Sequence, residues 1–74
     1  MRSADLHFFN ASATLVGRAE ADADAGDWLS VWDLMLDADR TIRHIEDPTV
    51  AAVAWERWAD HYEALETRCL NEGE

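Results

Sequence analysis

The positions of glycine and proline most limit what this chain of 74 residues can form. It contains three glycines and one proline, and they leave two long stretches without a helix breaker, one from Gly26 to Pro48 and one from Pro48 to Asn71. Glycine and proline are the residues least compatible with a helix interior. Uninterrupted stretches of this length therefore favour helices.

The stretch after Gly26 has the apolar spacing of an amphipathic helix. Its apolar residues recur at intervals of three and four, which places them on one face at about 3.6 residues per turn. They are Trp28, Val31, Trp32, Met35, Ala38, Ile42 and Ile45. Asp27 precedes them and suits the N-cap position, because its carboxylate can accept from free backbone N–H groups and faces the positive end of the helix dipole.

A second helix is predicted after Pro48. Asp47 suits its cap and Pro48 its first turn, where the missing N–H costs nothing. Its apolar residues follow at alternating intervals of four and three, and they are Ala51, Trp55, Trp58, Tyr62, Leu65 and Cys69. The connecting turn is short, so the two helices are expected to be antiparallel.

This arrangement places Trp32 near Tyr62, and Met35 near Trp58 or Ala59. The aromatic layer is then most simply the core, since a small domain without a disulfide needs bulky side chains to fill it. Trp28 lies near the end of the seam and is the tryptophan expected to be exposed enough to anchor a partner.

Residues 3–25 are less regular. Six apolar residues fit helical spacing, and Gly26 stands where a C-terminal glycine would stop such a helix; they are Leu6, Phe9, Ala13, Val16, Ala19 and Ala23. Asn10, Ser12, Thr14 and Gly17 are poor interior helix formers. A break near Asn10, or a short hairpin of Leu6–Phe9 and Thr14–Val16, is therefore the alternative.

The expected architecture is a single all-α domain spanning residues 1–74, a small three-helix bundle with up-down-up topology. The alternative is an α+β fold in which a short N-terminal hairpin lies on a helical hairpin. Ser3 is an acceptable cap for the first helix.

Catalytic and metal-binding motifs are weak. The three histidines fall one to each segment, and neither a His-Glu-x-x-His nor a Cys-x-x-Cys motif is present. Cys69 and His61 lie eight residues apart on one predicted helix, about 12 Å along its axis, too far to act as nucleophile and base. We therefore expect a protein that is not an enzyme and has no cofactor.

The alternating segment Glu20-x-Asp22-x-Asp24 is similar to the opening of a calcium loop. However, the glycine stands at the seventh position where the loop needs it at the sixth, and Val31 stands where a bidentate glutamate is required. We expect no metal site.

The net charge is −10, from sixteen acidic residues against six arginines. An acidic chain repels nucleic acid and anionic membranes, which attract Lys and Arg. The single cysteine, Cys69, cannot form an internal disulfide, which indicates a reducing compartment such as the cytosol. No apolar run is long enough for a signal peptide or a membrane span.

The acidic residues form rows at helical spacing. Asp33 and Asp37 share one face, and Glu56, Asp60 and Glu63 share another. Carboxylates four apart repel one another, so these rows do not help folding. Even if Arg40 pairs with Asp37 and Arg57 with Asp60, about ten acids are expected to stay free.

Two interpretations of this charge are open. It is a solvated face that keeps the protein soluble, or it is a docking surface. Acids one turn apart repeat every ~6 Å, comparable to the phosphates that a basic nucleic-acid groove evolved to hold. In the second case the candidate partner-binding residues are Glu20, Asp22, Asp24, Asp33, Asp37, Asp39, Glu56, Asp60 and Glu63.

In length, charge and lack of catalytic motifs the chain resembles small acidic phage-encoded inhibitors, in particular the nucleic-acid-mimicking anti-CRISPR proteins. The resemblance implies an inhibitor that occupies the basic nucleic-acid channel of a CRISPR effector complex in the host cell cytosol. Those proteins share no common fold, so the resemblance implies no architecture. The alternative is another helical interaction module, either an immunity protein or antitoxin that caps a basic nuclease, or a dimerising adaptor.

Overall fold

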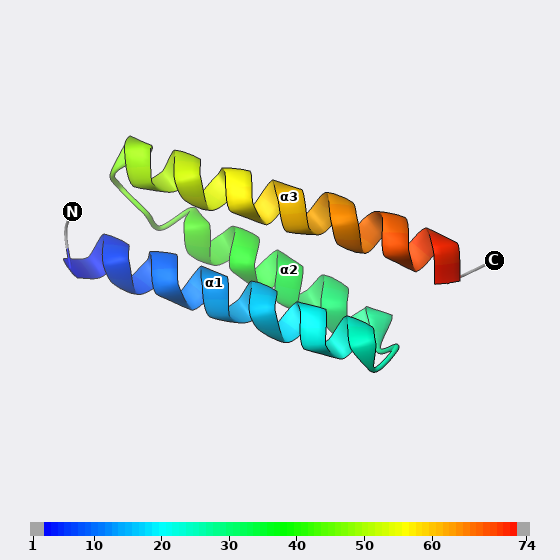
Figure 1. Ribbon diagram of the computed structural model, residues 1–74. Coiled ribbons are helices and arrows are strands. Elements are labelled where there is room, and N and C mark those ends of the chain that lie inside the picture. The colour runs from blue at the N-terminus through cyan, green and yellow to red at the C-terminus, as the bar shows by residue number, and fades with distance from the viewer. Residues whose placement is uncertain (1–2, 73–74) are drawn as a thin grey trace.

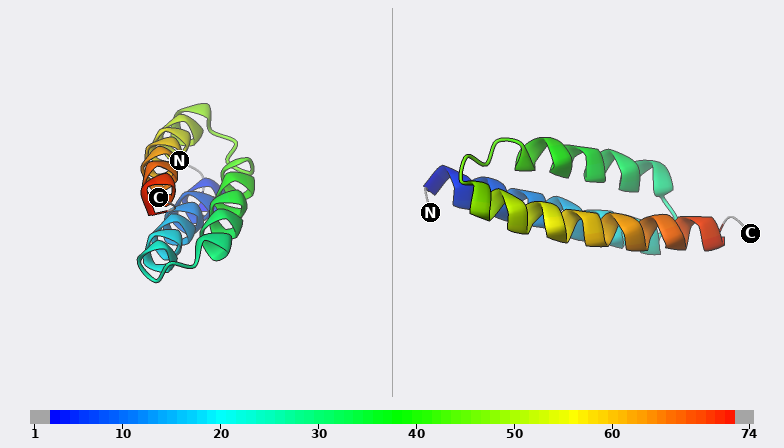
Figure 2. Two further views of the ribbon diagram at one scale, coloured as in Figure 1. Left: turned by 90° about the vertical axis from the view of Figure 1, so that its right-hand side faces the viewer. Right: turned by 90° about the horizontal axis from the view of Figure 1, so that it is seen from above.

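The computed structural model describes residues 3–72, which form three helices (Figure 1). They are α1 (Ser3–Asp24), α2 (Trp28–Ile42) and α3 (Pro48–Glu72). No strand occurs within the described residues, so the all-α bundle with up-down-up topology is confirmed and the N-terminal hairpin is wrong. The helices run along the long axis of a rod that measures 44 × 16 × 14 Å (Figure 2).

The turn between α1 and α2 confirms Gly26 as the residue that stops α1. Gly26 has a φ of 79°, in the left-handed region that L side chains rarely adopt. Its N–H donates to the carbonyl of Ala23 at 3.0 Å, and the N–H of Asp27 donates to the carbonyl of Asp22 at 2.9 Å. These two bonds are those of a Schellman motif, which satisfies the last carbonyls of the helix.

Both predicted aspartate caps are present. Asp27 Oδ1 accepts from the N–H of Ser30 at 3.3 Å and caps α2. Asp47 Oδ1 accepts from the N–H groups of Thr49 at 2.8 Å and Val50 at 3.3 Å and caps α3. Two of the acidic residues are therefore accounted for by helix starts.

The polar residues inside α1 do not break it. The Ser12 hydroxyl donates to the carbonyl of Phe9 at 2.8 Å, and the Thr14 hydroxyl donates to the carbonyl of Asn10 at 3.0 Å. Each hydroxyl thus bonds within the helix instead of supporting a turn. Ser3 is the first helical residue of α1.

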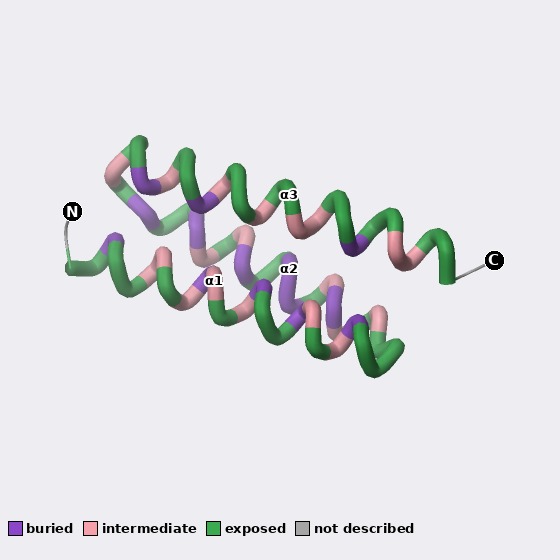
Figure 3. Tube along the Cα trace, in the orientation of Figure 1, coloured by how far each residue is buried: buried purple, intermediate pink, exposed green. Residues whose placement is uncertain are grey.

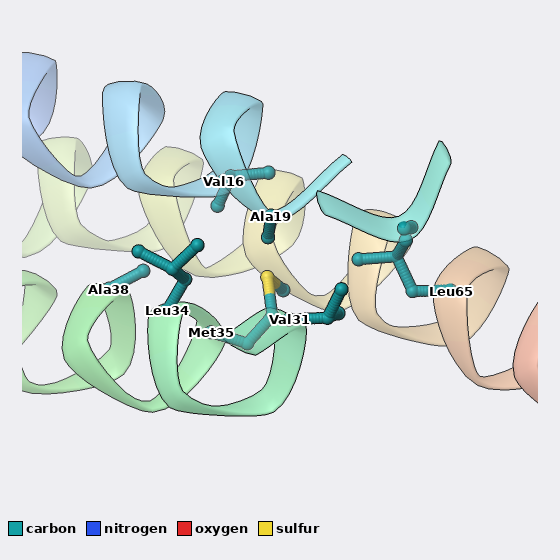
Figure 4. Packing of buried hydrophobic residues seen from close by; sticks show 8 residues of the cluster. Val16, Ala19, Val31, Leu34, Met35, Ala38 and Leu65 are labelled. Carbon is teal, nitrogen blue, oxygen red and sulfur yellow. The ribbon is translucent and has the colours of Figure 1, made fainter. Parts of the chain in front are cut away.

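The closest packing lies between α1 and α2. Ala19 and Ala23 of α1 and Ala38 of α2 are almost completely buried, and their small side chains let the two backbones approach. They belong to a cluster that runs between the helices (Figure 4), made up of Val16, Ala19, Ala23, Val31, Leu34, Met35, Ala38 and Leu65. A second cluster, near the α2–α3 turn, contains Ile42, Ile45, Val50 and Ala54.

The prediction that the aromatic layer forms the core is wrong. All four tryptophans are only partly buried and pack against the edges of the two clusters. The alanine-rich seam of α1 and α2 has no room for an indole, so the rings lie between α2 and α3. The predicted neighbours are confirmed, because the Trp32 and Tyr62 rings lie 5.5 Å apart and Trp58 Nε1 donates to the Met35 carbonyl at 2.9 Å.

A buried carboxylate joins the start of α1 to the α2–α3 turn. Asp5 is 1% exposed. Its Oδ1 accepts from the N–H of Glu46 at 2.9 Å, and its Oδ2 accepts from the N–H of Asp47 at 3.2 Å. Both N–H groups precede α3 and have no acceptor within a helix, so Asp5 supplies the partners that they would otherwise lack.

We predict that Asp5→Ala lowers the free energy of unfolding by about 2–4 kcal/mol, because the N–H groups of Glu46 and Asp47 lose a buried, charged acceptor. Urea denaturation followed by circular dichroism measures the change. Asp33→Ala removes an exposed carboxylate and is the control, with an expected change within about 0.5 kcal/mol. Equal effects of the two substitutions would show that the Asp5 bonds do not stabilise the fold.

The two described glycines give a matched pair. Gly17→Ala, in the interior of α1 with open space around the added methyl group, should stabilise the protein by about 0.5–1 kcal/mol. Gly26→Ala should destabilise it by about 1 kcal/mol, because alanine is strained at a φ of 79°. Shifts of opposite sign in thermal denaturation are expected, and a gain at both positions would contradict the left-handed turn.

Candidate functional site

The acidic segment at the end of α1 contacts the other two helices. Glu20 pairs with the His61 ring, Asp22 accepts from the hydroxyl of Ser30, and Asp24 pairs with Arg68 at 2.8 Å. The segment is helical, so the three carboxylates diverge instead of surrounding one point. These three candidate residues therefore each have a partner on another helix and do not form a free patch.

Arg68 is the centre of this end of the bundle. The hydrogen bond from its guanidinium to Asp24 raises the pKa of Arg68, and the negative charges of Asp24 and Glu72 act in the same direction. The guanidinium also lies 6.0 Å from the Trp28 ring. Trp28 Nε1 donates to Glu72 at 2.8 Å and its ring stacks on Trp32, so Trp28 is tied into the bundle and is not the exposed anchor that was expected.

The candidate residues of α2 fall into two groups. Asp37 pairs with Arg40 at 3.6 Å, as predicted, and Asp33 is exposed without an ion pair to any residue of 3–72. Asp39 pairs with Arg43 at 3.3 Å, and its side chain is only 17% exposed. Asp39 thus lies toward α3, away from the solvent face that carries the other two.

The candidate residues of α3 stay uncompensated. Glu56, Asp60 and Glu63 are exposed and make no ion pair or hydrogen bond within the described part of the chain. We call them the α3 row; the exposed side of α3 that carries them is shown in green in Figure 3. The predicted pair of Arg57 with Asp60 is wrong, because Arg57 points toward α1 and lies 5.1 Å from the Phe9 ring.

The exposed face of α1 contrasts with this row. From Leu6 to Ala21 the one carboxylate is that of Glu20, which is half-exposed and pairs with His61. The exposed residues of this stretch are Leu6, His7, Asn10, Thr14, Gly17, Arg18 and Ala21. The anionic surface is therefore confined to particular sides of the molecule. This uneven placement of the carboxylates could not be predicted from the composition, because the same composition is compatible with carboxylates spread evenly over the surface.

A groove of about 310 Å³ lies between α2 and α3. We call it the aromatic groove, and its lining residues are Trp32, Met35, Leu36, Asp39, Trp58 and Tyr62. The Trp58 and Tyr62 rings stack at 5.0 Å. Leu36 is 46% exposed at its edge. The groove was not predicted, because its rings were assigned to the core. The sequence did contain one indication of it: a seam rich in alanine is too narrow for so many large rings, so some of them must lie outside it.

Neither a metal site nor a membrane span is found in the described residues. No group of three or more His, Cys, Asp or Glu within 3–72 is placed to hold a metal ion. None of the three helices combines the length and hydrophobicity needed to cross a bilayer.

Comparison of the chain with family models, with curated proteins and with solved structures gives no match. The fold and its surfaces define a small helical bundle with an uncompensated acidic row on α3 and an aromatic groove between α2 and α3. What this protein does must therefore be argued from these two features.

We predict that the α3 row has no structural role. The variant Glu56→Gln, Asp60→Asn, Glu63→Gln should leave the free energy of unfolding unchanged or raise it by a few tenths of a kcal/mol, since repulsion between carboxylates one turn apart is relieved. Urea denaturation at low salt measures this. A loss above about 1 kcal/mol would mean that the row stabilises the fold.

Proposed function

We propose that this protein is a non-enzymatic inhibitor whose α3 row docks on a basic protein surface of the kind that holds nucleic acid. The observation that carries the proposal is the lack of any partner for Glu56, Asp60 and Glu63 within the described residues. Elsewhere most carboxylates are used in caps, in ion pairs or in the bond network of the bundle end.

The α3 row destabilises the folded state slightly and makes no stabilising contact in return, since like charges at this spacing repel. Its members lie on a straight helix and repeat at about one per turn, or ~6 Å. A surface built to bind phosphates is attracted by such a row at long range, and the attraction speeds the encounter. Binding then excludes nucleic acid by occupation, without chemistry.

The basic channel of a CRISPR effector complex is the specific target that we propose, because the chain resembles anti-CRISPR proteins in length and charge. A basic nuclease capped by an immunity protein or antitoxin presents the same kind of surface. The two targets differ in identity and share the physical requirement of an exposed basic groove.

The test uses two variants that change the net charge by the same three units. One neutralises the α3 row, by Glu56→Gln, Asp60→Asn and Glu63→Gln. The other adds three lysines to the exposed face of α1, which carries no unpaired carboxylate, by Asn10→Lys, Thr14→Lys and Ala21→Lys. Proteins captured from host lysate by the tagged wild type are identified by mass spectrometry, and their affinity for each variant is then measured.

Neutralising the row should weaken binding about tenfold or more, and the α1 variant should bind as the wild type does apart from a small uniform loss. Binding to wild type should fall steeply between low and high salt and be displaced by duplex DNA or RNA. Equal losses in both variants would mean that only total charge matters. Binding that is insensitive to salt and nucleic acid would overturn the proposal.

A further inference from the structure

We infer that the aromatic groove receives an amphipathic helix of the partner, with apolar residues on one face and lysine or arginine beside them. This inference rests on the proposed function and gives the partner its recognition element. The α3 row attracts basic surfaces in general, and charge alone does not discriminate among them. The aromatic groove supplies contacts that only a matching apolar side chain can make.

The lining of the groove suits apolar side chains. Trp32 and Tyr62 lie 5.5 Å apart across it, and the Trp58 ring stacks on Tyr62. The polar atom of Trp58 is already bonded to the Met35 carbonyl, which leaves the ring face toward the groove without a hydrogen-bonding need. Buried aromatic pockets of this composition are the usual anchor sites of protein interfaces.

The groove is open because of how the bundle is packed. The closest contact is between α1 and α2, and between α2 and α3 the Trp32, Trp58 and Tyr62 rings pack against the main cluster. The seam between α2 and α3 on the side opposite α1 is thus the position of a fourth helix in a four-helix bundle. From Trp32 to Asp39 the floor extends about 10 Å, which matches two turns of a docked helix.

The charges around the groove select a basic occupant. Asp33, three residues before Leu36, and Glu66, four residues after Tyr62, each lie one helical turn from a lining residue. Both are exposed and have no ion pair within residues 3–72. The net charge of −10 opposes a second copy of the chain in this position. In a helix with apolar anchors and flanking cations, the apolar side chains contact the aromatic lining and the cations pair with the carboxylates at the edges of the groove, as in helix-in-groove recognition.

The experiment uses the full chain and two synthetic peptides of about 14 residues with equal lysine content. One is a helical leucine–lysine peptide with its leucines on a single face, and the other has serine in place of each leucine. Isothermal titration calorimetry gives the affinities, and NMR shift mapping gives the location. The leucine peptide should bind about tenfold or more tightly than the serine peptide, with the largest shifts at Trp32, Leu36 and Tyr62.

Two matched substitutions locate the contact. Leu36→Ala should lower the affinity for the leucine peptide about five- to tenfold. Leu6→Ala is the control, because Leu6 is 47% exposed on α1 against 46% for Leu36, and it should leave the affinity unchanged. Circular dichroism checks that both variants keep their helices.

Several results would overturn the inference. They are no binding of the leucine peptide at low salt, equal binding of the two peptides, equal affinity of Leu36→Ala and wild type, or a concentration-dependent dimer lost in Leu36→Ala, which would make a second copy the occupant. If Leu36→Ala leaves the affinity for the captured partner unchanged while neutralising the α3 row lowers it, the inference about the groove is wrong and the proposed function stands. The opposite pattern would overturn the proposed function.

Discussion

The close approach of α1 to α2 determines the rest of this structure. Three alanines, Ala19, Ala23 and Ala38, are almost completely buried between the two helices, and side chains this small bring the backbones together. The large rings of α2 and α3 then have no place in the seam and line the opposite side. Thus the packing of one helix pair produces the groove between the other, and the asymmetry of the bundle follows from which residues face α1.

The acidic residues of this chain serve different purposes, which the net charge alone hides. Asp5, Asp27 and Asp47 accept backbone hydrogen bonds, and Asp24 pairs with Arg68. These carboxylates are explained by folding. The α3 row is not, because Glu56, Asp60 and Glu63 have no partner within the described residues.

Periodicity and caps were sufficient to predict α2, α3 and the order of the elements, because local signals such as Asp27 and Gly26 act through the backbone next to them. They left residues 3–25 open between a helix and a hairpin. They also placed Ile45 on the second helix, which is wrong, because α2 ends at Ile42 and Ile45 packs in the turn that follows. Less of the candidate site could be predicted from the sequence. Arg57 was expected to pair with Asp60, yet it points to Phe9, because the neighbours that a side chain can contact on another helix are defined only by the tertiary structure. Asp5 was missed for the same reason, since its partners are about forty residues away in the chain.

A binding protein must both meet its partner quickly and stay bound to it, and the acidic charge and the aromatic groove relate to these two requirements separately. Long-range attraction raises the rate of encounter and acts on any basic surface. Residence on one surface depends on short-range contacts, because most differences in affinity between related complexes lie in the dissociation rate. In the function that we propose, separate residues meet the two requirements, Glu56 and Asp60 for encounter and Leu36 with Trp32 for anchoring. A substitution in the row should therefore change mainly the association rate and its salt dependence, whereas one in the groove should change the dissociation rate.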